Sequence, residues 1–283
     1  MAMDEKRLGK LLQVARQRAG LTQQQLCQKA GLSYSTLAKI ERGAIKSPSI
    51  FTIQTIAHVL GTSLDELIGH EPKTVPQKRK SKSGVTFVYF DINGCLVRFF
   101  HRAFTAIATE TGLAPDLIET AFWHYNDAIC TGKLKTADFN KAFAKRLGID
   151  HIDWQKHYLA AVDPIPEMHE LIHWAVQYYN VGLLSNIGSG FVQDMTKHKL
   201  IPDVRYSAII DSSEVGVIKP DKKIYEIAQE RAKVPAKEIL FIDDSRANLI
   251  TAQAMGWHVM WFNDYDPLES TERVRAALEV AED

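Results

Sequence analysis

The stretch "ILFIDDSRANLITAQAMGWHVMWF", residues 239–262, carries the clearest architectural signal in the chain. It begins and ends with short apolar runs, 239–243 and 258–262, which flank a segment long enough for a helix. Strands that are apolar throughout and alternate with helices form parallel sheets that are covered on both faces. The pattern therefore predicts a parallel α/β sheet in which one strand ends at the paired carboxylates Asp243 and Asp244.

Three more apolar runs extend this sheet towards the N-terminus. They are "VTFVYFD" (85–91), "VGLLS" (181–185) and "YSAIID" (206–211), and the later ones each follow a helix-like segment. Sheets of this kind bind ligands beyond the carboxyl ends of their strands. Polar residues stand at those ends or in the loops that follow them: Asp91, Ser185, Asn186, Lys219, Asp243 and Asp244.

These side chains suit one kind of chemistry. Carboxylates from two neighbouring strands can share a Mg²⁺ ion, while a serine hydroxyl and a lysine ammonium suit phosphate oxygens. Asp91 is then free to attack phosphorus and form an aspartyl-phosphate. A single such residue is usually a cap or turn former, but the whole set in order predicts a site for Mg²⁺ and phosphate.

Residues 5–69 show helical periodicity that is broken at short intervals. Thr22 starts the segment "TQQQLCQKAG", which closes at Gly31, and Ser33 starts "SYSTLAKIERG". Two short helices joined by a tight turn form a helix-turn-helix. With one helix before them and two after, the last beginning at Ser63, we expect an all-α bundle of five helices.

Charge favours DNA as the partner of this bundle. Residues 1–84 hold 14 Lys and Arg against 6 Asp and Glu, and the whole chain has 34 of each, so the remainder carries the opposite excess. A helix in the major groove needs small or polar outward side chains, and the helix after Ser33 offers Tyr34, Ser35, Thr36 and Lys39. Periodicity alone also fits a bundle with no DNA role.

The segment "GHEPKTVPQKRKSKSG", 69–84, separates the two regions. It contains two prolines and almost nothing apolar, so we expect residues 71–84 to form a basic flexible linker. Its basic run at 78–82 is either a solvated tether or an additional set of phosphate contacts beside a DNA site.

The expected compartment is the cytoplasm. Cys27, Cys95 and Cys130 follow no disulfide pattern, which favours a reducing environment. No apolar run approaches the ~18 residues that a membrane span needs, and the charges at 4–7 exclude the core of a signal peptide.

The first region resembles a known family. "GLTQQQLCQKAGLSYSTLAKIERG" (20–43) followed by "PSIFTIQTIAHVLGTSLDELI" (48–68) is similar to the Cro/C1-type (XRE-like) helix-turn-helix domains of phage and bacterial repressors. The resemblance implies a domain over 1–70 that binds double-stranded operator DNA as a homodimer. It also implies base-edge contacts from Tyr34, Ser35 and Lys39, and phosphate or orienting contacts from Gln23, Thr36 and Arg42.

Residues 85–265 resemble the haloacid dehalogenase-like (HAD) hydrolase superfamily. "VYFDINGCL" matches its first motif, "LLSN" the second, "IKPDKKIYEIA" the third and the stretch at 239–262 the fourth. The resemblance implies a Rossmann-like domain over 85–283 with a small helical cap, at about 97–178, inserted after the first strand. It places the nucleophile at Asp91, phosphate contacts at Ser185 and Lys219, and metal ligands at Asp91, Asn93, Asp243 and Asp244.

Asn93 departs from the pattern of the phosphatases in this family, which have a second aspartate two residues after the nucleophile. That aspartate protonates the leaving oxygen and then activates water. An amide has no acid proton to give, and general acid–base catalysis typically contributes ~10²–10⁴-fold. The backbone carbonyl of Asn93, which the family uses as a metal ligand, is unaffected by the change. We therefore expect the metal and phosphate site to exist while turnover is weak.

Other members of the superfamily also lack the second aspartate. The dehalogenase branch works without metal, but it lacks the paired aspartates seen here at Asp243 and Asp244. The P-type pumps keep a long-lived aspartyl-phosphate, but nothing in this sequence predicts a membrane span.

Three functions remain after these observations. The first is a transcriptional regulator whose HAD-like domain binds Mg²⁺ and a phosphorylated small molecule as effector or slow substrate. The second is a Mg-dependent phosphatase with an accessory DNA-binding domain. The third is a dimerisation or interaction body with an inactive pocket. Retention of Asp91 and Asp244 argues against the third, and Asn93 argues for the first over the second.

Overall fold

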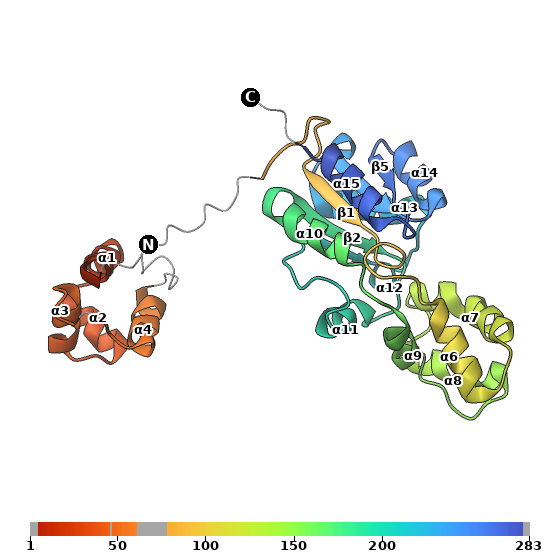
Figure 1. The fold of residues 1–283 in the computed structure, drawn as a ribbon, viewed down its shortest axis with the longest axis horizontal. Coiled ribbons are helices and arrows are strands. Elements are labelled where there is room, and N and C mark those ends of the chain that lie inside the picture. Colours follow the sequence, from red (N-terminus) through yellow and green to blue (C-terminus); the bar gives the residue numbers. More distant parts are fainter. Residues whose placement is uncertain (1–4, 46, 61–77, 280–283) are drawn as a thin grey trace. The chain divides into compact units, whose positions relative to one another are not determined.

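The computed structural model describes residues 5–45, 47–60 and 78–279, and it divides into two compact units, Met1–Gln77 and Lys78–Asp283. Each unit is described by itself (Figure 1). None of the helices in the described ranges is both long and apolar enough to cross a membrane.

The first unit is helical, with α1 (Glu5–Arg18), α2 (Gln23–Ala30), α3 (Tyr34–Glu41) and α4 (Ile50–Leu60). Thr22 caps α2 with a capping box, and Gly31 ends that helix at φ 62°, in the left-handed region that suits glycine. Ser33 caps α3. The expected helix-turn-helix is therefore present, whereas the expected fifth helix from Ser63 lies outside the described residues.

The helices of this unit pack around a small apolar core. Leu12, Leu26, Leu37 and Ile56 are fully buried there. Arg16 of α1 and Glu41 of α3 form a buried ion pair with an Nε–Oε1 distance of 2.7 Å. The core and the ion pair together fix α1 and α2 against α3, so the exposed face of α3 is presented on a rigid support.

The second unit is built on the expected parallel sheet, with strand order β3-β2-β1-β4-β5. The strands are β1 (Phe87–Phe90), β2 (Asn180–Ser185), β3 (Ala208–Asp211), β4 (Ile239–Asp243) and β5 (His258–Trp261). One face packs against α13 (Lys222–Ala232) and α14 (Arg246–Ala254). The other packs against α10 (Pro166–Tyr178), α11 (Phe191–Lys197) and α15 (Pro267–Ala277). Two short helical turns, α12 (Ser212–Val215) and η1 (Ala236–Glu238), complete this unit.

Four helices inserted after β1 form the cap: α6 (His101–Thr111), α7 (Pro115–Cys130), α8 (Thr136–Leu147) and α9 (Trp154–Ala161). They pack on one another and form a separate group beyond one end of the sheet (Figure 1). The cap is shorter than the expected 97–178, because α10 packs on β2 and α15 and so belongs to the sheet layer.

Part of the expected flexible linker is in contact with the second unit. The Lys78 ammonium donates to the carbonyls of Val176 and Tyr179, at 2.8 and 2.7 Å, at the carboxyl end of α10. A helix carboxyl end carries unpaired carbonyls and partial negative charge, which a lysine satisfies. The Arg79 guanidinium lies 4.1 Å from the centre of the Tyr178 ring. The expectation of a free tether is therefore wrong for residues 78–84, where charge and an aromatic surface hold the chain.

Candidate active site

Carboxylates from neighbouring strands meet at the carboxyl edge of the sheet. Strand β1 pairs with β4 so that Phe90 lies beside Ile242, which places the next residues, Asp91 and Asp243, at the same level. Oxygens of Asp91, Asp243 and Asp244 all lie within 4.8 Å of one another. The three aspartates expected at one site are therefore brought together.

Lys219 closes this carboxylate cluster from the loop after β3. Its buried Nζ lies 2.7 Å from Asp91 Oδ1 and 2.6 Å from Asp243 Oδ2. Burial disfavours the ammonium, but the two carboxylates outweigh that effect and raise the pKa of Lys219. The loop itself is held by Asn186, which accepts from the Lys219 backbone N–H at 2.7 Å and donates to its carbonyl at 2.8 Å.

Asp243 and Asp244 have different surroundings although they are adjacent. Asp243 is fully buried and accepts hydrogen bonds from Lys219, from the Ser245 N–H at 2.7 Å and from Asn248 at 3.0 Å. Asp244 is partly exposed, and burial together with repulsion from Asp91 and Asp243 raises its pKa to about 7. Asp243 is thus occupied in holding the site, whereas Asp244 has unbalanced negative charge next to Asp91.

The loop after β1 lies directly against Asp244. Gly94 has φ +83°, and a Cβ built there would overlap the Asp244 carboxylate. Only glycine fits this approach, so Gly94 belongs to the site although it was not among the residues expected there. The glycine three residues after Asp91 was the sequence feature that could have indicated this close approach.

The Ser185 hydroxyl, at the end of β2, is buried and has no hydrogen-bond partner within the described residues. Buried polar groups are nearly always satisfied, so this group needs an explanation. Asp91 Oδ1, in contrast, contacts the Lys219 ammonium at 2.7 Å. An anion would satisfy the Ser185 hydroxyl, which fits phosphate, and the clustered carboxylates of Asp91, Asp243 and Asp244 are oxygen donors that fit Mg²⁺.

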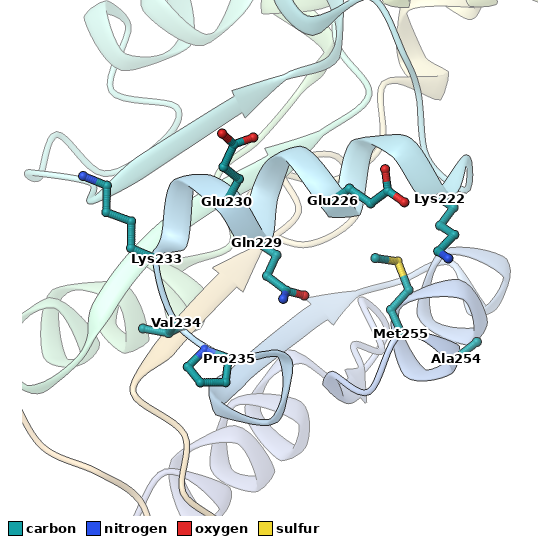
Figure 2. A pocket seen from close by; sticks show the side chains of 9 residues that line it. All are labelled: Lys222, Glu226, Gln229, Glu230, Lys233, Val234, Pro235, Ala254 and Met255. Atoms are coloured by element: carbon teal, nitrogen blue, oxygen red, sulfur yellow. The ribbon is translucent and has the colours of Figure 1, made fainter.

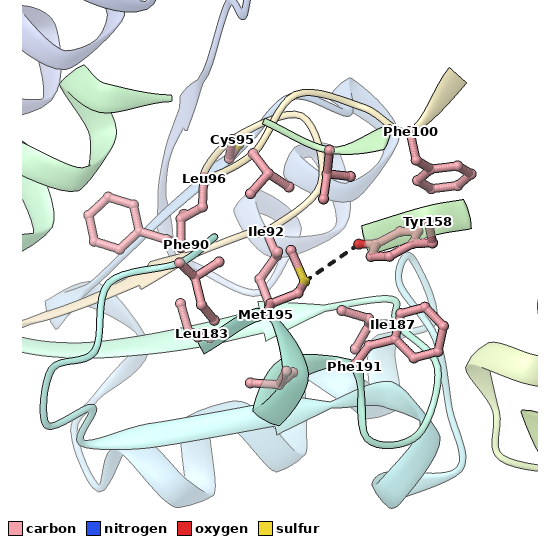
Figure 3. Close-up of a cluster of buried hydrophobic side chains, with 14 of the residues drawn as sticks. Phe90, Ile92, Cys95, Leu96, Phe100, Tyr158, Leu183, Ile187, Phe191 and Met195 are labelled. Carbon is pink, nitrogen blue, oxygen red and sulfur yellow. Dashed lines mark hydrogen bonds between the residues drawn. The ribbon is translucent and has the colours of Figure 1, made fainter. Parts of the chain in front are cut away.

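Asn93 makes a contact that the sequence did not predict. The Tyr158 hydroxyl, from cap helix α9, donates to Asn93 Oδ1 at 2.6 Å. Figure 3 shows the same hydroxyl directed at Met195, whose sulfur lies 3.6 Å away. Burial raises the pKa of Tyr158 well above its ordinary value, so the hydroxyl stays protonated. No local sequence signal links residues 65 positions apart.

A small pocket of about 30 Å³ lies between the cap and the sheet edge at this contact. Five of its twelve lining residues are aromatic, namely Phe100, Phe122, Trp154, Tyr158 and Phe191, and three are asparagines, Asn93, Asn126 and Asn186. A larger hollow of about 600 Å³ lies along α13 and the end of α14 (Figure 2). None of the strand-end residues lines that hollow, and its walls are charged and open, so it is separate from the candidate site.

The predicted DNA-contacting residues lie on or beside α3. Tyr34 is 54% exposed, and Ser35, Lys39 and Arg42 are also exposed. Thr36 is bonded to the cap residue Ser33 at 2.7 Å, which suits an orienting role. Gln23 donates from Nε2 to Glu41 at 2.8 Å, so its amide is joined to the buried ion pair rather than left free.

Comparison with known proteins identifies a family for each of the two regions. The haloacid dehalogenase-like hydrolase family matches residues 86–256, and a helix-turn-helix family matches residues 12–67. The structure resembles that of a HAD family enzyme from Bacteroides thetaiotaomicron in complex with magnesium and inorganic phosphate. That match has a TM-score of 0.55 and 21% identity, and it covers 64% of this chain and 96% of the other.

Two curated relatives match separate parts of the chain. An (S)-2-haloacid dehalogenase of Pseudomonas fluorescens is 26% identical over 83 residues, which cover 29% of this chain and 36% of the relative. The immunity repressor protein of Bacillus phage phi105 is 39% identical over 64 residues, which cover 23% of this chain and 44% of the relative. The chain thus spans less than half the length of either relative.

Proposed function

The chain belongs to the haloacid dehalogenase-like hydrolase family, and from this premise we propose a DNA-binding transcriptional regulator with a ligand-binding hydrolase-type domain. In this proposal the second unit binds Mg²⁺ and a phosphorylated small molecule as effector or slow substrate. The helix-turn-helix domain binds double-stranded operator DNA as a homodimer in the cytoplasm.

One observation carries the proposal. Asp91, Lys219 and the carboxylate pair lie together, and the unpartnered Ser185 hydroxyl stands at the end of strand β2, next to β1. In this proposal Asp91 is the nucleophile and Ser185 and Lys219 contact the phosphate, whereas an amide stands at Asn93 where proton transfer would be needed. A site of this kind holds a phosphorylated ligand well and turns it over slowly.

The metal site is proposed from the donors that remain available. Asp91 and Asp244 would hold Mg²⁺ together with the backbone carbonyl of Asn93, while Asp243 is engaged by Lys219, Ser245 and Asn248. Oxygen donors of this type are the ligands that Mg²⁺ prefers. When bound, the ion would offset the negative charge of the phosphoryl group that Ser185 and Lys219 orient.

The DNA-binding surface is proposed to be the exposed face of α3. In this proposal the exposed Tyr34, Ser35 and Lys39 would contact base edges, and the exposed Arg42 would contact phosphate. Gln23 and Thr36 support that face through Glu41 and Ser33. A repressor relative that matches this region is consistent with such a role.

One experiment on the full chain tests DNA binding and ligand binding together. The full chain selects an operator from a random duplex pool, and the operator affinity is then measured with Mg²⁺ and a panel of phosphorylated metabolites. We expect at least one metabolite to change the affinity by about 5- to 150-fold, the usual range of coupling between sites. Asp91→Asn should abolish the response, while Asp116→Asn, at an exposed position of the cap, should leave it intact.

The second candidate is a Mg-dependent phosphatase with an accessory DNA-binding domain. The ion pair between Asp91 and Lys219 keeps both groups in the arrangement that attack on a phosphoryl group requires, as this candidate needs. Turnover of a metabolite at ordinary rates, with no metabolite altering operator affinity, would establish this candidate and overturn the regulator.

A further inference from the structure

We propose that this site accepts phosphoryl groups from donors whose leaving group is stable as an anion, chiefly small acyl phosphates, and retains the phosphoryl group on Asp91. The inference rests on the function proposed above and names its substrate class. It comes from the contact between Tyr158 and Asn93 and from the pocket around it.

Tyr158 sets the direction in which the Asn93 amide faces. A tyrosine hydroxyl has a single proton, and here that proton is donated to Asn93 Oδ1 at 2.6 Å. The amide nitrogen of Asn93, with its two N–H groups, is therefore directed away from Tyr158. Asn93 is half-buried and lines the pocket, so these N–H groups are available to a ligand there.

An N–H group of this kind can solvate an anion but cannot transfer a proton to it. An alcohol leaving from a phosphate monoester departs as an alkoxide, whose conjugate acid is about as weak an acid as water. It therefore needs a proton as its bond to phosphorus breaks. A carboxylate has a conjugate acid with a pKa of ~4 and departs without one.

The first step then balances without an acid. A carboxylate oxygen of Asp91 forms a bond to phosphorus while the bond from phosphorus to the acyl oxygen breaks. The electron pair of the broken bond leaves with the carboxylate, which the Asn93 N–H groups can solvate. No proton moves, so the substitution at position 93 does not impede this step.

The second step, attack of water on the aspartyl-phosphate, does need a base. Among the described residues around the nucleophile, Asp243 is already hydrogen-bonded on both oxygens and Lys219 is a cation. Tyr158 is neutral and its hydroxyl is committed to Asn93. Asp244 faces the proposed metal site. The phosphoryl group should therefore remain on Asp91 far longer than on an enzyme with a carboxylate at position 93.

The pocket limits the size of the donor. Its volume of about 30 Å³ is roughly that of one or two water molecules, and Phe100, Phe122 and Trp154 form part of its wall. A small acyl group fits such a space better than a nucleoside. The pocket thus favours donors with a small leaving group, such as the acetate released from acetyl phosphate.

The test uses the full chain with Mg²⁺ and acetyl phosphate, and its first readout is the intact mass. We expect the wild type to gain one phosphoryl group that hydroxylamine removes, and to gain none from glycerol 3-phosphate. Asp91→Asn should gain none from either donor. Asn93→Asp, which is nearly isosteric, should lose the stable adduct because it can complete hydrolysis, and its thermal midpoint checks that it folds.

A second readout separates this inference from the proposed function. Calorimetry with Mg²⁺ and inorganic phosphate measures ligand binding without any reaction. Phosphate binding with no adduct from acetyl phosphate would overturn the inference and leave the proposed function standing. Absence of both phosphate binding and the adduct would overturn the inference and the proposed function together. Rapid hydrolysis of glycerol 3-phosphate by the wild type would also overturn the inference, because it would require a proton donor at the site.

Discussion

The hydroxyl of Tyr158 lies 2.6 Å from Oδ1 of Asn93 and joins cap helix α9 to the loop that carries Asp91. This contact occupies the side-chain oxygen at the position where a phosphatase would keep its general acid. Position 93 thus retains a hydrogen-bonding role in the site but has no proton to transfer.

Asn93→Asp should increase hydrolysis of a phosphate monoester that the pocket accepts by about 10²-fold or more, because it restores the missing proton-transfer group. The measurement is steady-state release of phosphate in the presence of Mg²⁺. Asp91→Asn in the same background should remove the gain. A variant that stays inert on a ligand shown to bind would indicate a pocket unsuited to in-line attack.

Ser185→Ala should weaken binding of inorganic phosphate in the presence of Mg²⁺ by roughly tenfold without destabilising the free protein. The hydroxyl is buried with no hydrogen-bond partner in the described residues, and an unsatisfied buried group costs about 1–3 kcal/mol. Calorimetry and chemical denaturation provide the two measurements.

The matched control for this prediction is Ser212→Ala. Ser212 is also buried, but its hydroxyl accepts from the Ile187 N–H at 3.0 Å. Its removal should lower the free energy of unfolding by about 1 kcal/mol. Equal losses of stability in the two variants would contradict the idea that the Ser185 hydroxyl forms its hydrogen bond only with a bound ligand.

Asp244→Asn should abolish Mg²⁺ binding and stabilise the metal-free protein above pH 7. The pKa of Asp244 is raised from 3.8 to about 7, so the folded state binds more protons than the unfolded state between these values. The wild type therefore loses stability as pH rises from about 4 to 7, by an amount on the order of a few kcal/mol.

The Asp244→Asn variant should not lose stability in this way between about pH 4 and pH 7. Denaturation of metal-free protein at pH 4 and pH 8, with and without the substitution, measures the difference. An identical pH profile for both proteins, or an unchanged affinity of the variant for Mg²⁺, would show that the site is misplaced.

Lys39→Ala should weaken specific operator binding by roughly 1–3 kcal/mol if the side chain reads a base. The lysine is exposed on α3 of the helix-turn-helix. Lys78→Ala serves as control, because its ammonium is held by the carbonyls of Val176 and Tyr179. We expect no change in that variant, and a comparable loss in both would assign the basic run at 78–82 to DNA after all.

Glu41→Gln should destabilise the first unit by about 3 kcal/mol or more, since it leaves Arg16 buried without its charge partner. The side chains of Arg16 and Glu41 are only 10% and 2% exposed. The helical transition of the first unit, followed by circular dichroism, is the measurement. Gln28→Ala, on the exposed face of α2, should change stability by less than about 0.5 kcal/mol.

The sequence by itself determined the features that depend on local patterns. Apolar runs alternating with helices were sufficient to predict the parallel sheet, because strands buried on both faces must be apolar throughout. Parallel strands end at one edge, so the order of residues along the chain was enough to place Asp91, Asp243 and Lys219 together. Thr22 and Ser33 were recognised as caps, because a capping side chain bonds the backbone only two or three residues away.

Only the tertiary structure decided the contacts between distant segments. Tyr158 meets Asn93 because the cap folds back over the sheet edge, and no periodicity encodes that approach. Lys78 is bound because the end of α10 lies within its reach, whereas the composition of its segment indicated a solvated tether. Such contacts depend on how whole elements pack, and packing is set by the combined shape of many side chains rather than by any short stretch of the chain.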